Sequence, residues 1–308
     1  LFSNENEHST NLIKLSLSMK ITTGTMPFKG YQTYYRIVGE PTDNAPLLLI
    51  HGGPGSTHNY FEVLDDLAVT TRRQIISYDQ IGCGESYVDG HPELWTLTTW
   101  LDELEALRSH LHLDRVNLLG QSWGGMLIIA YMIDRHPEGI ESIILSSTLP
   151  SSELWSHEQQ RLISFMPDDE QEAIARAVAT GNFDDPAYLK ANDHYTVLHA
   201  DEITDASPEC FRRPKRFGTE SYLTAWGPNE YTPTGTLRDF DYTDRLGEIT
   251  DPTLIISGTN DECTPLIAKT MDDNMPNAIW ELLDGARHMT FIDQTDTYKQ
   301  LLIGWLMS

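Results

Sequence analysis

One serine of this chain lies between two glycines, in the motif GQSWG at residues 120–124. The pattern G-x-S-x-G places a serine on a sharp turn between a strand and a helix, where its hydroxyl faces substrate. The flanking sequence agrees, because the apolar run Val116–Leu119 precedes the turn and an apolar segment, residues 125–132, follows it. The spacing therefore predicts Ser122 as the nucleophile of an acyl-transfer reaction.

A serine nucleophile needs a general base, and the base needs a carboxylate that orients it. In hydrolases built on a parallel sheet, these groups follow the serine in the order acid, then histidine. His288 is the only histidine after Asp261, and it lies in the loop that leaves the apolar run Ile279–Leu283. We expect His288 to carry the proton and Asp261, which follows the run Thr253–Ile256, to hold the imidazole. Glu262 is the alternative acid.

Acyl transfer also needs hydrogen-bond donors for the oxyanion that develops on the substrate. The backbone N–H of Trp123, directly after the nucleophile, is one predicted donor. The second is expected from the loop HGGPG at residues 51–55, which follows the apolar run Leu47–Ile50. Glycines let the backbone approach a ligand closely. Gly53 is the predicted second donor, with Gly52 as the alternative.

The elements that must position these residues alternate along the chain. Short, nearly continuous apolar runs are typical of parallel strands that are buried on both faces; they occupy residues 47–50, 74–78, 116–119, 142–145 and 253–256. Leucines at helical spacing from Leu97 to Leu111 predict a helix, with Thr99 and Asp102 resembling a capping box at its start. A second, buried helix follows Ser122 and ends near Pro137. This alternation predicts an α/β fold with a mostly parallel central sheet flanked by helices.

The pattern breaks between residues 149 and 239, where the chain is polar and partly helical. Some ninety residues without structure would be unusual in a compact protein, so we predict an inserted helical cap over residues 149–239 and a core made of residues 19–148 and 240–308. Residues 1–18 begin with leucine and precede Met19, and we interpret them as a leader or an added extension. The predicted cap contains a basic cluster, defined as residues 212–216 with the sequence RRPKR.

Composition excludes several classes of partner. The formal net charge of −25 argues against nucleic acid and anionic membranes, which bind basic patches. No apolar run is long enough to span a membrane. The three cysteines are too few and too widely spaced for a disulfide framework or a metal site, which favours a reducing, cytoplasmic location. Neither a metal nor an organic cofactor is expected, and the sequence leaves the oligomeric state open, a homo-oligomer included.

Across residues 19–308 the chain resembles the proline iminopeptidases (prolyl aminopeptidases) of the bacterial type, serine peptidases of the α/β-hydrolase fold. Four segments carry the resemblance: HGGPG at 51–55, YDQIGCGES at 78–86, GQSWGG at 120–125 and WGPNEY at 226–231. Ile81 departs from the family, which often has a basic residue there. We expect this departure to affect the loop rather than the chemistry.

The resemblance implies release of an N-terminal residue, preferably proline, from short peptides that begin with proline or another small apolar residue. Such a site must bind a protonated amine, and carboxylates are the groups that accept its hydrogen bonds. Glu230 matches the family's cap motif and is the main candidate for this role, with Glu209 as a weaker second. Trp123 and Tyr231 are candidates for the apolar walls around a pyrrolidine ring, or for core residues.

Two other functions compete with this interpretation. A general amidase or esterase of the same fold would share the triad without needing a free N-terminus. A non-catalytic binding protein would usually have lost a triad residue, and here all three are present. We therefore expect a serine exopeptidase.

Overall fold

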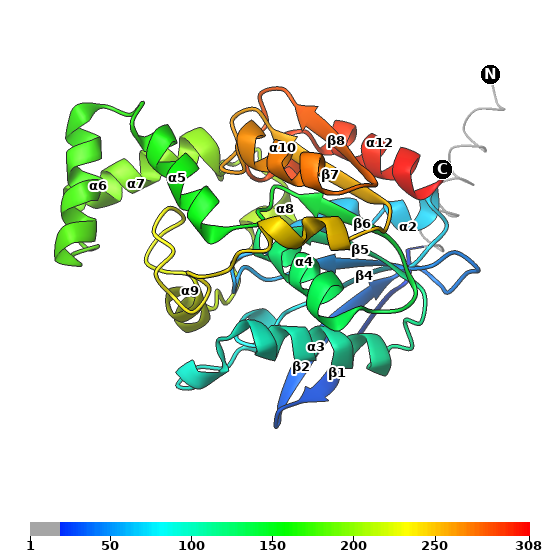
Figure 1. Cartoon of the computed structure of the whole chain (residues 1–308). Coiled ribbons are helices and arrows are strands. Elements are labelled where there is room, and N and C mark those ends of the chain that lie inside the picture. The colour runs from blue at the N-terminus through cyan, green and yellow to red at the C-terminus, as the bar shows by residue number, and fades with distance from the viewer. Residues whose placement is uncertain (1–18) are drawn as a thin grey trace, which may run out of the picture.

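The computed structural model describes residues 19–308, and in it one eight-stranded sheet carries the predicted nucleophile and its neighbours (Figure 1). The strand order is β1-β2-β4-β3-β5-β6-β7-β8. Pairing is antiparallel between β1, β2 and β4, and parallel between all the other neighbours. The strands are β1 (Ile21–Phe28), β2 (Tyr31–Val38), β3 (Leu47–Ile50), β4 (Ile75–Tyr78), β5 (Val116–Gln121), β6 (Ile140–Ser146), β7 (Thr253–Gly258) and β8 (Ala278–Leu283).

The central strands are the ones that the apolar runs predict. Every residue of β3, β4, β5 and β7 is buried, as expected for parallel strands covered on both faces. The sequence reasoning did not predict the hairpin β1–β2 at the edge of the sheet. Most residues of β1 are exposed or half-buried, so this strand lacks the apolar run that marks the others.

Helices cover both faces of the sheet. One core cluster packs α3 (Leu97–His110), α4 (Trp123–Arg135) and α10 (Pro265–Asn274) against one face. The other face packs against α2 (Leu67–Thr70), α11 (Thr290–Asp293) and α12 (Thr295–Leu306). The capping prediction for α3 is wrong by three residues: the N-cap is Thr96, whose side chain accepts a hydrogen bond from the backbone of Thr99.

The chain between β6 and β7 is helical. It forms α5 (Ser152–Ile163), α6 (Asp168–Thr180), α7 (Pro186–His199), α8 (Glu209–Arg212) and α9 (Thr219–Ala225). Figure 1 shows α5, α6 and α7 extending beyond one end of the sheet, and these helices share a separate core cluster that includes Ile174 and Tyr195. The exact division at residues 148/149 and 239/240 stays a prediction, and the interpretation of residues 1–18 lies outside the described residues.

Short 3-10 helices complete the connections: η1 (Asn59–Leu64), η2 (Gly84–Ser86), η3 (Pro92–Leu94) and η4 (Thr243–Glu248). Within residues 19–308, every helix is too short or too polar to cross a lipid bilayer. The fold class predicted from the sequence is confirmed: a mostly parallel sheet between two helical layers, with helices inserted after β6.

Candidate active site

Ser122 occupies a strained turn between β5 and α4. Its backbone φ is 54°, in the left-handed region that non-glycine residues rarely adopt. Both flanking glycines are sterically required: a Cβ atom at Gly120 would overlap the carbonyl of Gly124, and one at Gly124 would overlap the carbonyl of Ile50. The close approach of α4 to β5 explains Gly120, and its close approach to β3 explains Gly124. Together the two contacts hold the serine at the end of the sheet.

A cavity of about 360 Å³ opens above this turn. Ser122 and His288 both line it, together with Gly53, Glu230 and Glu262. These residues come from the loop after β3, the turn after β5, the loops after β7 and β8, and the turn that follows α9. The carboxyl ends of four parallel strands thus meet the inserted helices at one cavity, which is where open α/β sheets bind ligands.

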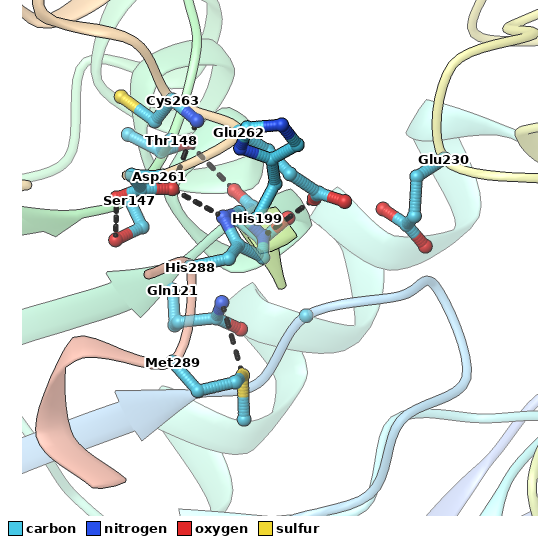
Figure 2. A network of polar contacts seen from close by, with 12 residues as sticks. Gln121, Ser147, Thr148, His199, Glu230, Asp261, Glu262, Cys263, His288 and Met289 are labelled. Atoms are coloured by element: carbon cyan, nitrogen blue, oxygen red, sulfur yellow. Dashed lines mark hydrogen bonds and ion pairs between the residues drawn. The ribbon is translucent and has the colours of Figure 1, made fainter. Parts of the chain in front are cut away.

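His288 and Asp261 form a buried pair (Figure 2). Nδ1 of His288 lies 2.8 Å from Oδ1 of Asp261. The carboxylate is itself held firmly, because the hydroxyl of Ser147 donates to Oδ2 at 2.6 Å and the backbone N–H groups of Gly258 and Cys263 donate at 3.1 and 2.8 Å. A carboxylate with this many donors can orient an imidazole ring through its other lone pairs.

The inserted helices also hold His288. Its backbone N–H donates to the carbonyl of His199 at the end of α7, and its ring contacts the indole of Trp155 on α5 at 5.6 Å between ring centres. Burial by itself lowers the pKa of His288, but the charge of Glu262, the hydrogen bond to Asp261 and the charge of Glu230 outweigh burial and raise the pKa to about 9.

Glu262 lies at the opposite nitrogen of the imidazole from Asp261. The sequence offers it only as the alternative acid, yet Oε2 of Glu262 lies 3.6 Å from Nε2 of His288, the ring nitrogen that Asp261 does not bind. Its side chain is fully buried, and neither carboxylate oxygen has a hydrogen-bond partner among the described residues. Burial and the nearby charge of Glu230 raise its pKa well above the ordinary value of 4.5. Adjacency to Asp261 was the one available signal.

Glu230 faces the same point from the segment after α9, as Figure 2 shows. Its carboxylate accepts a hydrogen bond from the hydroxyl of Tyr222 at 2.6 Å, and its carbonyl accepts the indole N–H groups of Trp155 and Trp226 at 2.8 and 3.3 Å. One ligand atom from each of Glu230, Glu262 and His288 lies within 4.8 Å of the others. This cluster could hold a small cation, either a metal ion or an ammonium group.

Glu209 is not part of this cluster. It lies on α8, its side chain is 67% exposed, and its carboxylate pairs with Arg213 one helical turn later. It does not line the cavity around Ser122.

The loop after β3 distinguishes its two glycines. The backbone N–H of Gly52 donates to the hydroxyl of Tyr60 at 2.6 Å, so this donor is already used. Gly53 has a φ of 111° and lines the cavity. Gln80 joins this loop to the elbow: its side-chain amide donates to the carbonyl of His51 and accepts from the indole N–H of Trp123, both at 2.8 Å.

The apolar lining of the cavity differs from the expectation. The indole of Trp123 packs against Trp100, and the ring of Tyr231 packs against Tyr195, so both are core residues, and neither lines the cavity. The apolar and aromatic lining residues are Tyr60, Ala200, Phe211, Tyr222, Pro228 and Met289. Lys215 of the basic cluster and Asp201 also line this cavity, and the sequence carried no signal for either.

Fold and site together define an α/β hydrolase, and the family model of the alpha/beta hydrolase fold matches residues 45–295. A proline iminopeptidase of Lactobacillus helveticus (strain DPC 4571) is 60% identical over 289 residues, which are 94% of this chain and 98% of that protein. One from Clostridioides difficile (strain 630) is 55% identical over 94% of this chain and 99% of its own length. The crystal structure of a proline iminopeptidase of Mycobacterium smegmatis superposes with a TM-score of 0.81 at 31% identity, covering 93% of this chain and 98% of that one. The chain belongs to the proline iminopeptidase family.

Proposed function

We propose that this protein is a serine exopeptidase that releases N-terminal proline from short peptides through an acyl-enzyme. Ser122 attacks the carbonyl of the first residue, and His288 takes the hydroxyl proton and returns it to the leaving amine. Asp261 holds the imidazole with Nε2 directed into the cavity and stabilises its charged form. Water then attacks the acyl-enzyme in place of the amine: His288 takes a proton from the water and returns it to the oxygen of Ser122, and proline leaves as the free amino acid.

The observation that carries this proposal is the pair of carboxylates beside the nucleophile. Glu230 and Glu262 line the cavity that contains Ser122, and both oxygens of Glu262 are buried without hydrogen-bond partners in the described part of the chain. Burying carboxylate oxygens without hydrogen bonds costs free energy unless a ligand donates hydrogen bonds to them. The protonated amine of a peptide N-terminus supplies both donors and positive charge.

We therefore assign the second amine-binding carboxylate to Glu262 in place of Glu209. The exposed ion pair of Glu209 with Arg213 leaves it outside the cavity, whereas Glu262 has its oxygens inside. Binding of the amine at Glu230 and Glu262 limits the enzyme to the first residue of a peptide, because only the first residue has a main-chain ammonium group next to its carbonyl.

The oxyanion donors in this proposal are the backbone N–H groups of Gly53 and Trp123. Gly53 is favoured over Gly52 because the N–H of Gly52 is bound to Tyr60. The N–H of Trp123 lies in the first turn of α4, where backbone donors have no partner within the helix and the helix dipole favours negative charge. The side chain of Gln80 bonds both the loop at residues 51–55 and Trp123, and so holds the two donors at a constant separation.

The preference for proline comes from the named activity of the relatives and is supported by the apolar residues that line the cavity. Tyr222 contacts the carboxylate of Glu230, and Phe211 and Met289 line the same cavity, so apolar surface is available to a ring that carries its charge on one edge. The mechanism uses only groups of the chain, and we propose no cofactor. We also propose a cytoplasmic location, supported by three buried cysteines that are all unpaired.

Turnover of prolyl-arylamide substrates tests this function. Wild-type protein should release proline from a free prolyl-arylamide and not from its N-acetyl form, and Ser122→Ala should abolish release while the protein remains folded. A fluorophosphonate probe should label the wild type and not Ser122→Ala. Equal turnover of the free and acetylated substrates would indicate a general amidase or esterase instead, and absence of labelling would indicate a non-catalytic protein.

A further inference from the structure

The basic cluster at residues 212–216 contains one side chain that differs from its neighbours. Nε of Arg212 donates to the carbonyl of Ser207, and Arg213 forms ion pairs with Glu62 and Glu209. The guanidinium of Arg216 stacks on the ring of Tyr87, 3.4 Å from its centre.

Lys215 alone of the cluster points into the cavity that contains Ser122. Within the described residues, its ammonium group has neither an ion pair nor a hydrogen bond; it lies 5.4 Å from the centre of the Tyr60 ring. It is also the only lysine or arginine among the residues that line this cavity.

The contact with Tyr60 locates this charge relative to the reacting atoms. Tyr60 binds the backbone N–H of Gly52 and donates to the side chain of Gln121, the residue before the nucleophile. Lys215 therefore lies beside a residue that binds the oxyanion loop, whereas Glu230 and Glu262 group with His288. The cavity thus has one end with two carboxylates, at His288, and one end with an ammonium group, at Tyr60.

These two ends match a zwitterion. A dipeptide with a protonated amine carries a carboxylate about one residue beyond the scissile bond, which is a reach of roughly 3.5 Å along an extended chain. Asp201 also lines the cavity but forms no ion pair with Lys215, and burial raises the pKa of its carboxyl, which weakens its repulsion of an incoming carboxylate.

We propose that Lys215 binds the C-terminal carboxylate of the residue that follows the scissile bond, so that dipeptides with N-terminal proline are the preferred substrates. This inference rests on the proposed function and deepens it. A charge-assisted hydrogen bond between Lys215 and the carboxylate would add to the binding of a dipeptide, while a longer peptide or an arylamide would not form it. Lys215 is a specificity-determining residue in this proposal.

The experiment compares Pro-Gly with Pro-Gly-amide, which differ only in the carboxylate. Release of proline is measured by chromatography for wild type, Lys215→Met, Lys215→Gln, Lys215→Arg and the control Arg212→Met, which removes a neighbouring positive charge outside the cavity. We expect Lys215→Met and Lys215→Gln to lower kcat/KM for Pro-Gly by about tenfold or more, mainly through KM, and to change the value for Pro-Gly-amide by less than about twofold. Lys215→Arg should restore part of the preference, and Arg212→Met should behave like wild type.

Equal losses on Pro-Gly and Pro-Gly-amide would overturn the proposal, because Lys215 would then act on the fold or on the oxyanion. Unchanged kinetics with both peptides would overturn it as well. If Lys215→Met did not fold, Lys215→Gln would be compared with wild type on Pro-Gly and on Pro-Gly-amide in its place. Failure of the proposed function has a different signature: wild-type protein would release no proline from either peptide or from a prolyl-arylamide.

Discussion

Oε2 of Glu262 lies 3.6 Å from Nε2 of His288, so the proposed amine-binding carboxylate faces the nitrogen that must accept the proton from Ser122. In the protein without substrate, this negative charge favours the protonated imidazole. A substrate ammonium group bound to Glu262 offsets that charge and favours the neutral imidazole. Binding of the substrate N-terminus and the protonation state of His288 are therefore linked through the carboxylate of Glu262.

The first prediction concerns the pH dependence of kcat/KM. His288 acts as a base only when it is neutral, and its pKa in the free protein is raised to about 9, so kcat/KM for a prolyl-arylamide should rise as the pH increases toward 9. Glu262→Gln removes the largest of the contributions that raise this pKa, so its rising limb should move to lower pH. The comparison is made between two pH profiles on one substrate, which cancels titration of the substrate amine. If the rising limb of kcat/KM lay at the same pH in both proteins, Glu262 would not control the protonation of His288.

The second prediction concerns binding of the substrate amine, which we assign to Glu230 and Glu262 and not to the exposed Glu209. Loss of a charge-assisted hydrogen bond to the substrate amine should lower kcat/KM by about 10- to 100-fold, so Glu230→Gln and Glu262→Gln should each do so for a free prolyl-arylamide. Their effect on a simple ester without an amine should be much smaller. Glu209→Gln is the matched control and should retain wild-type kinetics, because Glu209 pairs with Arg213 outside the cavity.

Equal losses on the arylamide and the ester would refute amine recognition by these residues. If Glu209→Gln lowered kcat/KM for the arylamide but not for the ester, Glu209 would be an amine-binding carboxylate after all.

The third prediction concerns the support of the base. Asp261→Asn should lower kcat by about 10³- to 10⁴-fold with little change in KM, since the amide can hold the ring in the wrong tautomer and does not stabilise the imidazolium. Ser147→Ala removes only the 2.6 Å hydrogen bond to the far oxygen of Asp261, so its loss should be about tenfold or less. Both are measured by steady-state kinetics on a prolyl-arylamide. A larger loss for Ser147→Ala than for Asp261→Asn would show that Asp261 does not orient His288.

The fourth prediction concerns the elbow and uses urea unfolding. A Cβ atom at Gly124 would overlap the carbonyl of Ile50, so Gly124→Ala should lower the free energy of unfolding by about 2–4 kcal/mol. Gly304 is the control: it is exposed in α12, and a Cβ atom there would contact nothing. Gly304→Ala should raise the free energy of unfolding by about 0.5–1 kcal/mol. Equal stability of the two variants would show that β3 and α4 can separate at little cost.

Local sequence patterns predicted the fold well, for a physical reason. A parallel strand buried on both faces must be apolar throughout, and a strand–turn–helix elbow must have glycines where the backbones cross, so both leave a mark within a few residues. The edge hairpin β1–β2 left no such mark, because most of β1 faces solvent and tolerates polar residues. The capping pattern at Thr99 and Asp102 indicates the wrong start for α3, whose N-cap is Thr96, because capping residues are short-range signals that recur by chance.

The sequence by itself determined the fold class, the family and the order of Ser122, Asp261 and His288 along the chain, since these follow from local patterns and chain order. Only the tertiary structure decided which carboxylates meet. Glu262 and Glu230 are 32 residues apart in number, yet the packing of the inserted helices over the sheet brings both to His288 and leaves Glu209 in solvent. The same packing directs Lys215 inward while its basic neighbours find partners outside. No local pattern records such contacts, because they arise from segments that meet only when the sheet and the inserted helices close over one cavity.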